Sequence, residues 1–384
     1  MENARSTYAL LDQYEHRLKA VAGLLNVTEN TLRNYLAESG IKVKRANADN
    51  PKSPAIRLFD LPKIFEFADY RRRKNSRGTE GKRPVVVAVE IIKGGTAKTT
   101  TTGELAVQLQ LFGLKVLAID LDIQANLTHI LGYEADLSVE EAEKFGVSHA
   151  AIVTGTFATL CKPLLDRRRA VSVDAETLLK RPFGPFGPAL IPSDTFFGDL
   201  EIAIATTQGP RELTFQKFFR ESQEGRIPGL NVGDYDVVIM DCPPHVSFVA
   251  TNAIAAADII IAPVRMEAFS VKGLSKLITE IETLREAYPN NVRQPELVIL
   301  PAYYSINLTR NARMQDKLSQ YPGCVAPTLI SQSEEFPKSL ESYLPLTLTK
   351  PRCEAVKQYQ AFADFMYKKI RERAKSQKTE GTLL

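Results

Sequence analysis

Residues 93–100 carry the amino-acid types that a phosphate-binding loop needs. An apolar run precedes this segment and a helical pattern follows it. A loop between a strand and a helix points backbone N–H groups at phosphate oxygens, and the helix N-terminus adds a favourable dipole. The segment is therefore predicted to bind the phosphates of a nucleotide. It reads, in order, Lys93, Gly94, Gly95, Thr96, Ala97, Lys98, Thr99 and Thr100.

Several residues of this loop have distinct expected roles. Gly94 and Gly95 lack side chains and let the backbone approach the phosphates closely. Lys98 is expected to neutralise the β and γ phosphates, and the Thr99 hydroxyl to bind Mg²⁺. Thr100 is expected to reach the α phosphate. Because the guanine-specific NKxD motif does not occur in the chain, the expected nucleotide is ATP.

The loop departs from the strict GxxxxGK[ST] pattern. The two glycines of that pattern fall on Ile92 and Ala97 in this chain. Ala97 is a small departure that is tolerable if the backbone there is already helical. The loop also has a second lysine, Lys93, directly before its paired glycines.

Apolar runs of strand length alternate with helical patterns after residue 84. Short, uninterrupted apolar strands are typical of a parallel sheet that helices cover on both faces. A doubly wound, mostly parallel α/β fold is therefore predicted, with the phosphate loop after its first strand. Residues 133–190 give no clear assignment. The runs span residues 85–92, 115–120, 237–240, 259–264 and 297–300.

Charge divides the chain into two unequal parts. Residues 1–83 hold 17 Lys/Arg and 10 Asp/Glu, a net charge of +7. The remainder holds 32 Lys/Arg and 35 Asp/Glu, a net charge of −3. A basic excess confined to one segment indicates nucleic-acid contact there, although a solvated basic face would have the same composition.

Composition excludes several other classes of protein. The four cysteines and four histidines are dispersed and form no CxxC or zinc-ligand spacing. No apolar run approaches the ~20 residues of a membrane-spanning helix. The N-terminus has no apolar stretch of the kind found in signal peptides. A cytoplasmic location is expected.

The loop, read as KGGxxK[ST], resembles the deviant Walker A box of the ParA/MinD family of ATPases. This resemblance covers about residues 84–370. In that family the first lysine, here Lys93, reaches across a dimer to the partner's nucleotide. The resemblance implies that Lys93 and Lys98 are catalytic, that ATP and Mg²⁺ are the cofactors, and that the active form is a homodimer.

Two further motifs resemble those of the same family. Residues 117–128, with Asp120 and Asp122, resemble its IDxDPQxNxT strand, with Ile123 in place of proline. Residues 237–244 resemble its Walker B strand and DxPP motif, and Asp241 ends the apolar run. The resemblance implies that Asp122 positions the attacking water. It also implies that Asp120 lies close to the metal and that Asp241 holds Mg²⁺ through water.

Residues 20–36 have the pattern of a helix-turn-helix. Thr28 is expected to cap the second helix, in which Leu32 and Leu36 alternate with polar residues that could enter a major groove. A basic loop that follows is interpreted as the wing of a winged variant, and a plain helical bundle is the alternative. The candidate DNA contacts are Thr28, Asn30, Thr31, Arg33, Asn34, Lys42, Lys44 and Arg45.

These patterns predict four segments along the chain. Residues 1–70 form a helix-turn-helix DNA-binding domain and residues 71–84 a basic linker. Residues 85–372 form the deviant Walker A ATPase domain, and residues 373–384 a polar tail. This combination resembles the larger plasmid-partition ATPases, which also repress their own operon.

The resemblance implies a partition ATPase with slow intrinsic turnover that dimerises on ATP. It implies nonspecific DNA binding by the dimer, nucleoid association, specific operator binding by the N-terminal domain, and stimulation by a ParB-type centromere-binding protein. An ATP-sensing transcriptional repressor and a MinD-like membrane-positioned ATPase are the alternatives. A C-terminal apolar face is expected to dock on the protein body rather than on a membrane. It consists of Ala361, Phe362, Phe365, Met366 and Ile370.

Overall fold

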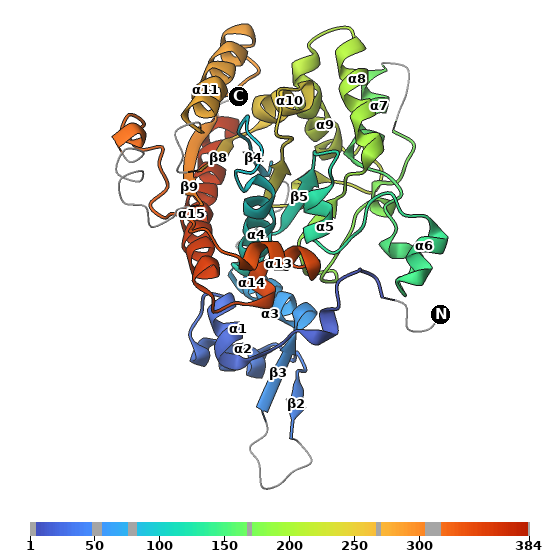
Figure 1. Ribbon diagram of the computed structural model, residues 1–384, viewed down its shortest axis with the longest axis vertical. Helices are drawn as coiled ribbons and strands as arrows, with labels where there is room; N and C mark the ends of the chain where they lie inside the picture. The colour runs from blue at the N-terminus through green and yellow to red at the C-terminus, as the bar shows by residue number, and fades with distance from the viewer. Residues whose placement is uncertain are drawn as a thin grey trace.

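A computed structural model describes residues 5–47, 56–75, 83–166, 171–265, 270–303 and 316–382 (Figure 1). Its main element is a six-stranded sheet in which every recorded strand pairing is parallel. The predicted doubly wound parallel sheet is confirmed. In spatial order the strands are β6 (Ala189–Ile191), β5 (Val116–Asp120), β7 (Val237–Asp241), β4 (Val85–Val89), β8 (Ile259–Arg265) and β9 (Glu296–Ala302).

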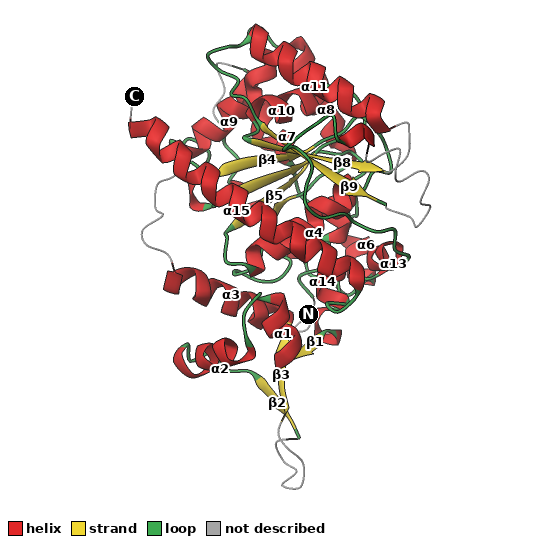
Figure 2. Cartoon of the chain, turned by 90° about the vertical axis from the view of Figure 1, so that its left-hand side faces the viewer, coloured by secondary structure: helices red, strands yellow, loops and turns green. Residues whose placement is uncertain are grey.

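Helices cover both faces of this sheet (Figure 2). Side chains of β4 alternate between two apolar clusters: Val85, Val87 and Val89 belong to one, and Val86 and Ala88 to the other. This alternation explains the uninterrupted apolar sequence, because both faces of the strand are buried. On the first face lie α4 (Lys98–Leu111) and α15 (Glu354–Thr382); on the second lie α9 (Thr214–Gln223), α10 (Phe248–Ala256) and α11 (Ser270–Ala287).

Residues 133–190, which the sequence left unassigned, connect the sheet to its edge strand β6. The turn around residues 182–188 buries Phe183, whose ring stacks on that of Phe65 at 5.0 Å. This stacking joins the segment to the N-terminal part of the chain. Within the described residues, the other α-helices of the main body are α5 (Asn126–Ile130), α6 (Val139–Lys144), α7 (Phe157–Leu165), α8 (Gly198–Thr206), α13 (Glu335–Glu341) and α14 (Leu346–Thr349).

The N-terminal part forms a small α+β unit below the sheet in Figure 1. Its three strands pair antiparallel in the order β1-β3-β2. Thr28 caps α2, accepting a hydrogen bond from the backbone N–H of Thr31 at 3.1 Å, which confirms the predicted cap. The elements are β1 (Glu15–Arg17), α1 (Leu18–Leu24), α2 (Glu29–Glu38), β2 (Lys44–Ala46), β3 (Ile56–Asp60) and α3 (Leu61–Asn75).

Helices extend into two of the predicted segments. The first five residues of the predicted linker, 71–75, continue α3, and residues 76–82 lie outside the described residues. Asp69 explains the continuation, because it pairs with Arg72 and Arg73 at helical spacings of three and four. The predicted polar tail is also helical, since α15 continues to Thr382, and residues 373–378 are mostly good helix formers.

Buried hydrogen bonds tie α4 to the C-terminal part of the chain. The Glu104 carboxylate accepts hydrogen bonds from the backbone N–H groups of Leu346 at 2.6 Å and Thr347 at 3.1 Å. Burial raises the pKa of Glu104 to about 7. Thr101 also contacts the Tyr359 hydroxyl at 3.0 Å. Because α4 begins at the phosphate loop, these bonds fix the position of that loop relative to α14 and α15.

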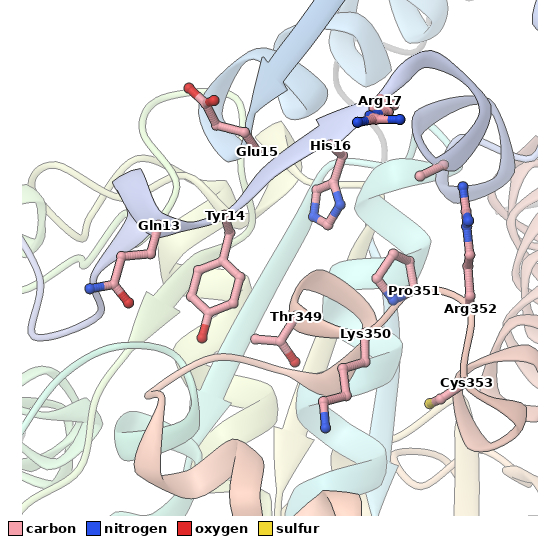
Figure 3. A pocket seen from close by; sticks show the side chains of 11 residues that line it. Gln13, Tyr14, Glu15, His16, Arg17, Thr349, Lys350, Pro351, Arg352 and Cys353 are labelled. Atoms are coloured by element: carbon pink, nitrogen blue, oxygen red, sulfur yellow. The ribbon is translucent and has the colours of Figure 1, made fainter.

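The same region contacts the N-terminal unit. The His16 ring nitrogen lies 2.8 Å from the carbonyl oxygen of Leu348 in α14. Beside this contact, residues 13–17 and 349–353 line a cleft of about 690 Å³ (Figure 3). The N-terminal unit therefore packs directly on the segment that α4 anchors.

Candidate nucleotide-binding site

The phosphate loop follows β4 and ends where α4 begins at Lys98. Gly95 has φ of +67°, the left-handed region that glycine adopts without strain. Ala97 has φ of +71°, so its backbone is left-handed and the condition under which alanine is tolerable here is not met. The turn into α4 requires the left-handed conformation at its N-cap, and that is why other loops of this pattern place glycine there.

Replacing Ala97 with glycine is expected to stabilise the protein. A left-handed residue with a Cβ costs about 1–2 kcal/mol, and the extra freedom of glycine in the unfolded chain offsets about 0.4–1 kcal/mol of the gain. We expect urea denaturation to show a net gain of about 0.5–1 kcal/mol. Ala361→Gly, at an exposed position inside α15, is the control. Its free energy of unfolding should fall by a similar amount, because glycine destabilises a helix interior. If Ala97→Gly lowers the free energy of unfolding as much as Ala361→Gly does, the left-handed backbone of Ala97 is not strained.

Lys98 lies within the loop that it is predicted to serve. Its Nζ donates to the carbonyl oxygens of Ile91 at 3.1 Å and Lys93 at 3.0 Å. The side chain is 7% exposed. The structure thus places the ammonium group inside the curve of the loop, where phosphate oxygens can replace the carbonyl groups as its acceptors.

Two buried carboxyl groups lie beside the loop. Asp120 and Asp241 end the neighbouring strands β5 and β7 and are direct partners in the register. Burial raises the pKa of both groups, and the charge of Asp120 raises that of Asp241 further. Thr128 holds Asp120 through its backbone N–H and its hydroxyl, both at 2.8 Å. Two negative charges held this close favour a bound cation.

The residues present fit a magnesium ion. The Thr102 hydroxyl donates a hydrogen bond to Asp241 Oδ1 at 3.0 Å, and the nearby Thr99 side chain partly offsets the rise in the pKa of Asp241. Its other oxygen, Oδ2, is buried without a hydrogen-bond partner among the described residues. An orphaned carboxylate oxygen next to a threonine hydroxyl and a second carboxylate offers the hard oxygen ligands that Mg²⁺ prefers. The structure therefore brings the three predicted metal-site residues together.

Asp122 lies two residues beyond β5 and is 7% exposed. Its Oδ1 accepts a hydrogen bond from the backbone N–H of Gln124 at 3.0 Å, and its own N–H donates to Asp120 Oδ1 at 3.1 Å. Both bonds lie within the turn that follows β5. The carboxylate is thus held in one orientation at the same sheet edge as the metal-site residues.

Sequence reasoning missed four residues of this site. Thr102 bridges the Lys98 carbonyl oxygen and Asp241, and Thr128 holds Asp120. Thr128 ends the 117–128 motif but was given no role there, and nothing in the local sequence singles out Thr102. Arg265, at the end of β8, donates to the Gly95 carbonyl at 3.3 Å and stacks on Tyr303. Glu90 is buried within reach of the Lys98 charge, and burial raises the pKa of Glu90 to about 8.

The C-terminal apolar face packs on the body. Phe362, Met366 and Ile370 are fully buried, with Phe365 half-buried against the same core. Ala361 was wrongly placed on this face; it is exposed, and Ala363 is buried instead. Within the described residues no helix is both long and apolar enough to cross a bilayer.

The candidate DNA contacts cluster on and near α2. Thr28, Asn30 and Asn34 are exposed, and Thr31 is half-buried. Arg33 pairs with Glu29 at 3.3 Å, and Lys44 with Glu15 at 2.8 Å. These acids neutralise part of the charge that the prediction assigned to DNA. Lys42 and Arg45 are exposed.

A parallel sheet with a phosphate loop after β4 and acidic residues ending β5 and β7 defines a P-loop nucleotide-binding protein. A model of an AAA domain, AAA_31, matches residues 85–294. Since this match covers more than half of the chain, the protein belongs to that family. With its two-lysine loop and its ParA-family relatives, it is of the ParA/MinD type.

Relatives and solved structures agree with this placement. A ParA family protein of Chlamydia trachomatis is 28% identical over 275 residues, covering 71% of this chain and 93% of its own. The structure of a Cyanothece McdA variant in complex with ATP is 20% identical, with a TM-score of 0.56 over 76% of this chain and 96% of its own. A structure described as a partition protein is 15% identical, with a TM-score of 0.60 over 94% of this chain and 92% of its own. These two structural likenesses show the fold alone.

Proposed function

We propose that the protein is a partition ATPase that binds and hydrolyses ATP with Mg²⁺. One observation carries this proposal: the two-lysine loop lies beside Asp120, Asp122 and Asp241 at a single sheet edge. The Cyanothece structure was solved with ATP on the same fold, which supports ATP as the nucleotide.

The expected chemistry divides among these residues. Lys98 and the loop N–H groups bind the phosphates, and Asp122 orients the attacking water. Asp241, Asp120 and Thr99 hold the metal. When bound, Mg²⁺ neutralises charge on the β and γ phosphates. Lys93 completes the site from the partner of a homodimer, so turnover of the isolated monomer is slow.

An apolar rim beside the site supports a homodimer. Ile123 directly follows Asp122 and is 41% exposed, and Phe196, Ile202 and Val246 are 72%, 66% and 66% exposed. The Glu201 carboxylate holds this rim together by accepting hydrogen bonds from the N-terminus of α10. Exposed apolar groups that gather at one edge are typical of an interaction surface. A second copy, which brings Lys93 to the opposite nucleotide, is the proposed occupant.

Lys93→Ala is expected to bind ATP within about threefold of wild type but to remain monomeric, because its ammonium group would neutralise phosphates across the dimer rather than within one chain. Light scattering with ATP and Mg²⁺ measures the dimer, and calorimetry measures the affinity. Lys144→Ala, on the exposed surface of α6, is the control. If Lys93→Ala forms an ATP-dependent dimer as tightly as the wild type, Lys93 does not contact the partner's nucleotide.

DNA is the second proposed partner. Residues 1–70 act as a winged helix-turn-helix domain that reads an operator and represses the protein's own operon. The ATP-bound dimer binds DNA without sequence preference and associates with the nucleoid, and a ParB-type centromere-binding protein stimulates hydrolysis. The basic excess of residues 1–83 and the exposed polar residues of α2 support the operator-binding part.

The test combines turnover with DNA binding by the full-length protein. We expect slow, Mg²⁺-dependent release of phosphate from ATP, and binding to a random-sequence duplex with ATP but much less with ADP. Turnover that is undetectable at any DNA concentration would favour an ATP-sensing repressor. Binding to anionic vesicles that matches binding to DNA would favour a membrane-positioned ATPase instead.

A further inference from the structure

Three arginines converge on one pocket in the N-terminal unit. The pocket has a volume of about 340 Å³, and its lining residues are Leu18, Arg33, Arg45 and Arg57. The arginines come from α2, β2 and β3, which lie side by side at the end of the molecule away from the six-stranded sheet (Figures 1 and 2). Among the described residues, no acidic side chain lines this pocket.

The strand register forces two of these charges together. Arg45 of β2 lies directly opposite Arg57 of β3 in the antiparallel pairing. Directly opposed side chains have Cβ atoms about 4.5–5.5 Å apart, and like charges in that position destabilise a sheet. The neighbouring Lys44 points to the other face and is paired with Glu15. Two arginines facing each other at a pocket therefore favour an anion between them.

The third arginine approaches from the helix. Arg33 is half-exposed and bonds to Glu29 and Asn30, both on its own helix. Its contact with Glu29 at 3.3 Å is a solvent-exposed ion pair of the kind that contributes little to stability. An anion in the pocket can therefore recruit the Arg33 guanidinium at small cost.

We infer that Arg33, Arg45 and Arg57 form a clamp for one phosphate of a DNA duplex backbone. Guanidinium groups bind phosphate oxygens in a bidentate geometry. The described lining includes no aromatic side chain on which the base of a free nucleotide could stack. The clamp lies beside the exposed Asn30 and Asn34 of α2, so it fixes the register of that helix on the duplex.

The inference rests on the proposed operator binding and refines it. Arg33 and Arg45 were both predicted as DNA contacts from the sequence, but Arg57 was not, because nothing in the local pattern places it beside them. Contacts to the backbone position a protein without reading sequence. Arg33 thus serves binding to every duplex equally, and discrimination between sequences is left to the asparagines.

The test uses the full-length protein with ADP and a 30-bp duplex that the wild type enriches from a random pool, together with a scrambled duplex. Arg57→Gln and Arg45→Gln should each weaken binding to both duplexes by about tenfold and lower the log–log salt slope by about one. Arg371→Gln on the exposed surface of α15 makes the same charge change and should have no effect.

A stability measurement separates the clamp from a structural role. Because removing one of two opposed like charges relieves repulsion, both variants should unfold at the wild-type temperature or above it. A lower unfolding temperature with unchanged DNA binding would overturn the clamp. So would a loss of affinity confined to the enriched duplex, which indicates base reading.

Three further outcomes are distinguishable. If calorimetry shows that inorganic phosphate binds the pocket but saturating phosphate displaces the duplex no more than potassium chloride of equal ionic strength, the pocket is a small-anion site and the inference fails. If the wild type enriches no sequence at all, the proposed operator binding fails. If the wild type enriches a duplex and the arginine variants bind it normally, only the clamp fails.

Discussion

The Lys98→Ala variant is expected to lose at least about a hundredfold in affinity for ATP and, with it, all detectable hydrolysis. The Lys98 ammonium is held inside the loop by the carbonyl oxygens of Ile91 and Lys93. Exchanging those neutral acceptors for phosphate oxygens pairs the ammonium with a negative charge, which adds the attraction between two ions to each hydrogen bond. Two such bonds in a partly dry site are worth about 3 kcal/mol or more, and each 1.4 kcal/mol is a tenfold change in affinity.

Titration calorimetry with ATP and Mg²⁺ measures this effect. Lys357→Ala, an exposed lysine on α15, is the control for the loss of one positive charge. Circular dichroism should show the same helix content for both variants, because the two carbonyl groups that Lys98 contacts can be satisfied by water instead. An ATP affinity for Lys98→Ala that equals that of the control would remove the loop from phosphate binding.

The second large effect is expected at Asp122. Asp122→Ala should bind ATP within about threefold of wild type and hydrolyse it at least about a hundredfold more slowly. Its carboxylate lies outside the phosphate loop but at the same sheet edge, so it contributes to positioning of the water rather than to ground-state binding. Single-turnover phosphate release with saturating ATP measures the chemical step.

Asp122→Asn distinguishes this role from a structural one. The amide oxygen of asparagine can still accept the hydrogen bond from the Gln124 N–H, so the turn after β5 is preserved. The negative charge is lost, and hydrolysis should fall as far as in Asp122→Ala. Near-normal hydrolysis by Asp122→Asn would mean that the residue only shapes the turn and that another group orients the water.

Local sequence signals were sufficient to predict the central strands, the phosphate loop and the acidic residues beside it. Strands β4, β5, β7, β8 and β9 were predicted within a few residues, because a strand buried on both faces must be apolar throughout. The phosphate loop was equally clear, since its lysines, glycines and threonines act within a single turn of chain. The acidic residues could be named because each lies at or just beyond the end of one of these strands.

Tertiary structure decided what depends on residues far apart in the sequence. The left-handed backbone of Ala97 follows from how the loop must enter α4, and the side-chain type alone indicates the opposite. Asp120 and Asp241 become a pair only when β5 and β7 come into register. Residues 133–190 form no continuous apolar run, because they pack mainly through loops and short helices, so their path to β6 had no local signature.

In the N-terminal unit too, one feature could be predicted from the sequence and another only from the fold. Its capped helix α2 was readable from Thr28 and the spacing of leucines, because capping and helix periodicity act over four residues. The pocket of Arg33, Arg45 and Arg57 was not readable, because only the antiparallel register of β2 and β3 opposes two arginines next to a helix. Sequence specifies which residues can bind an anion; the fold decides which of them meet, because charge acts over distances that only packing sets.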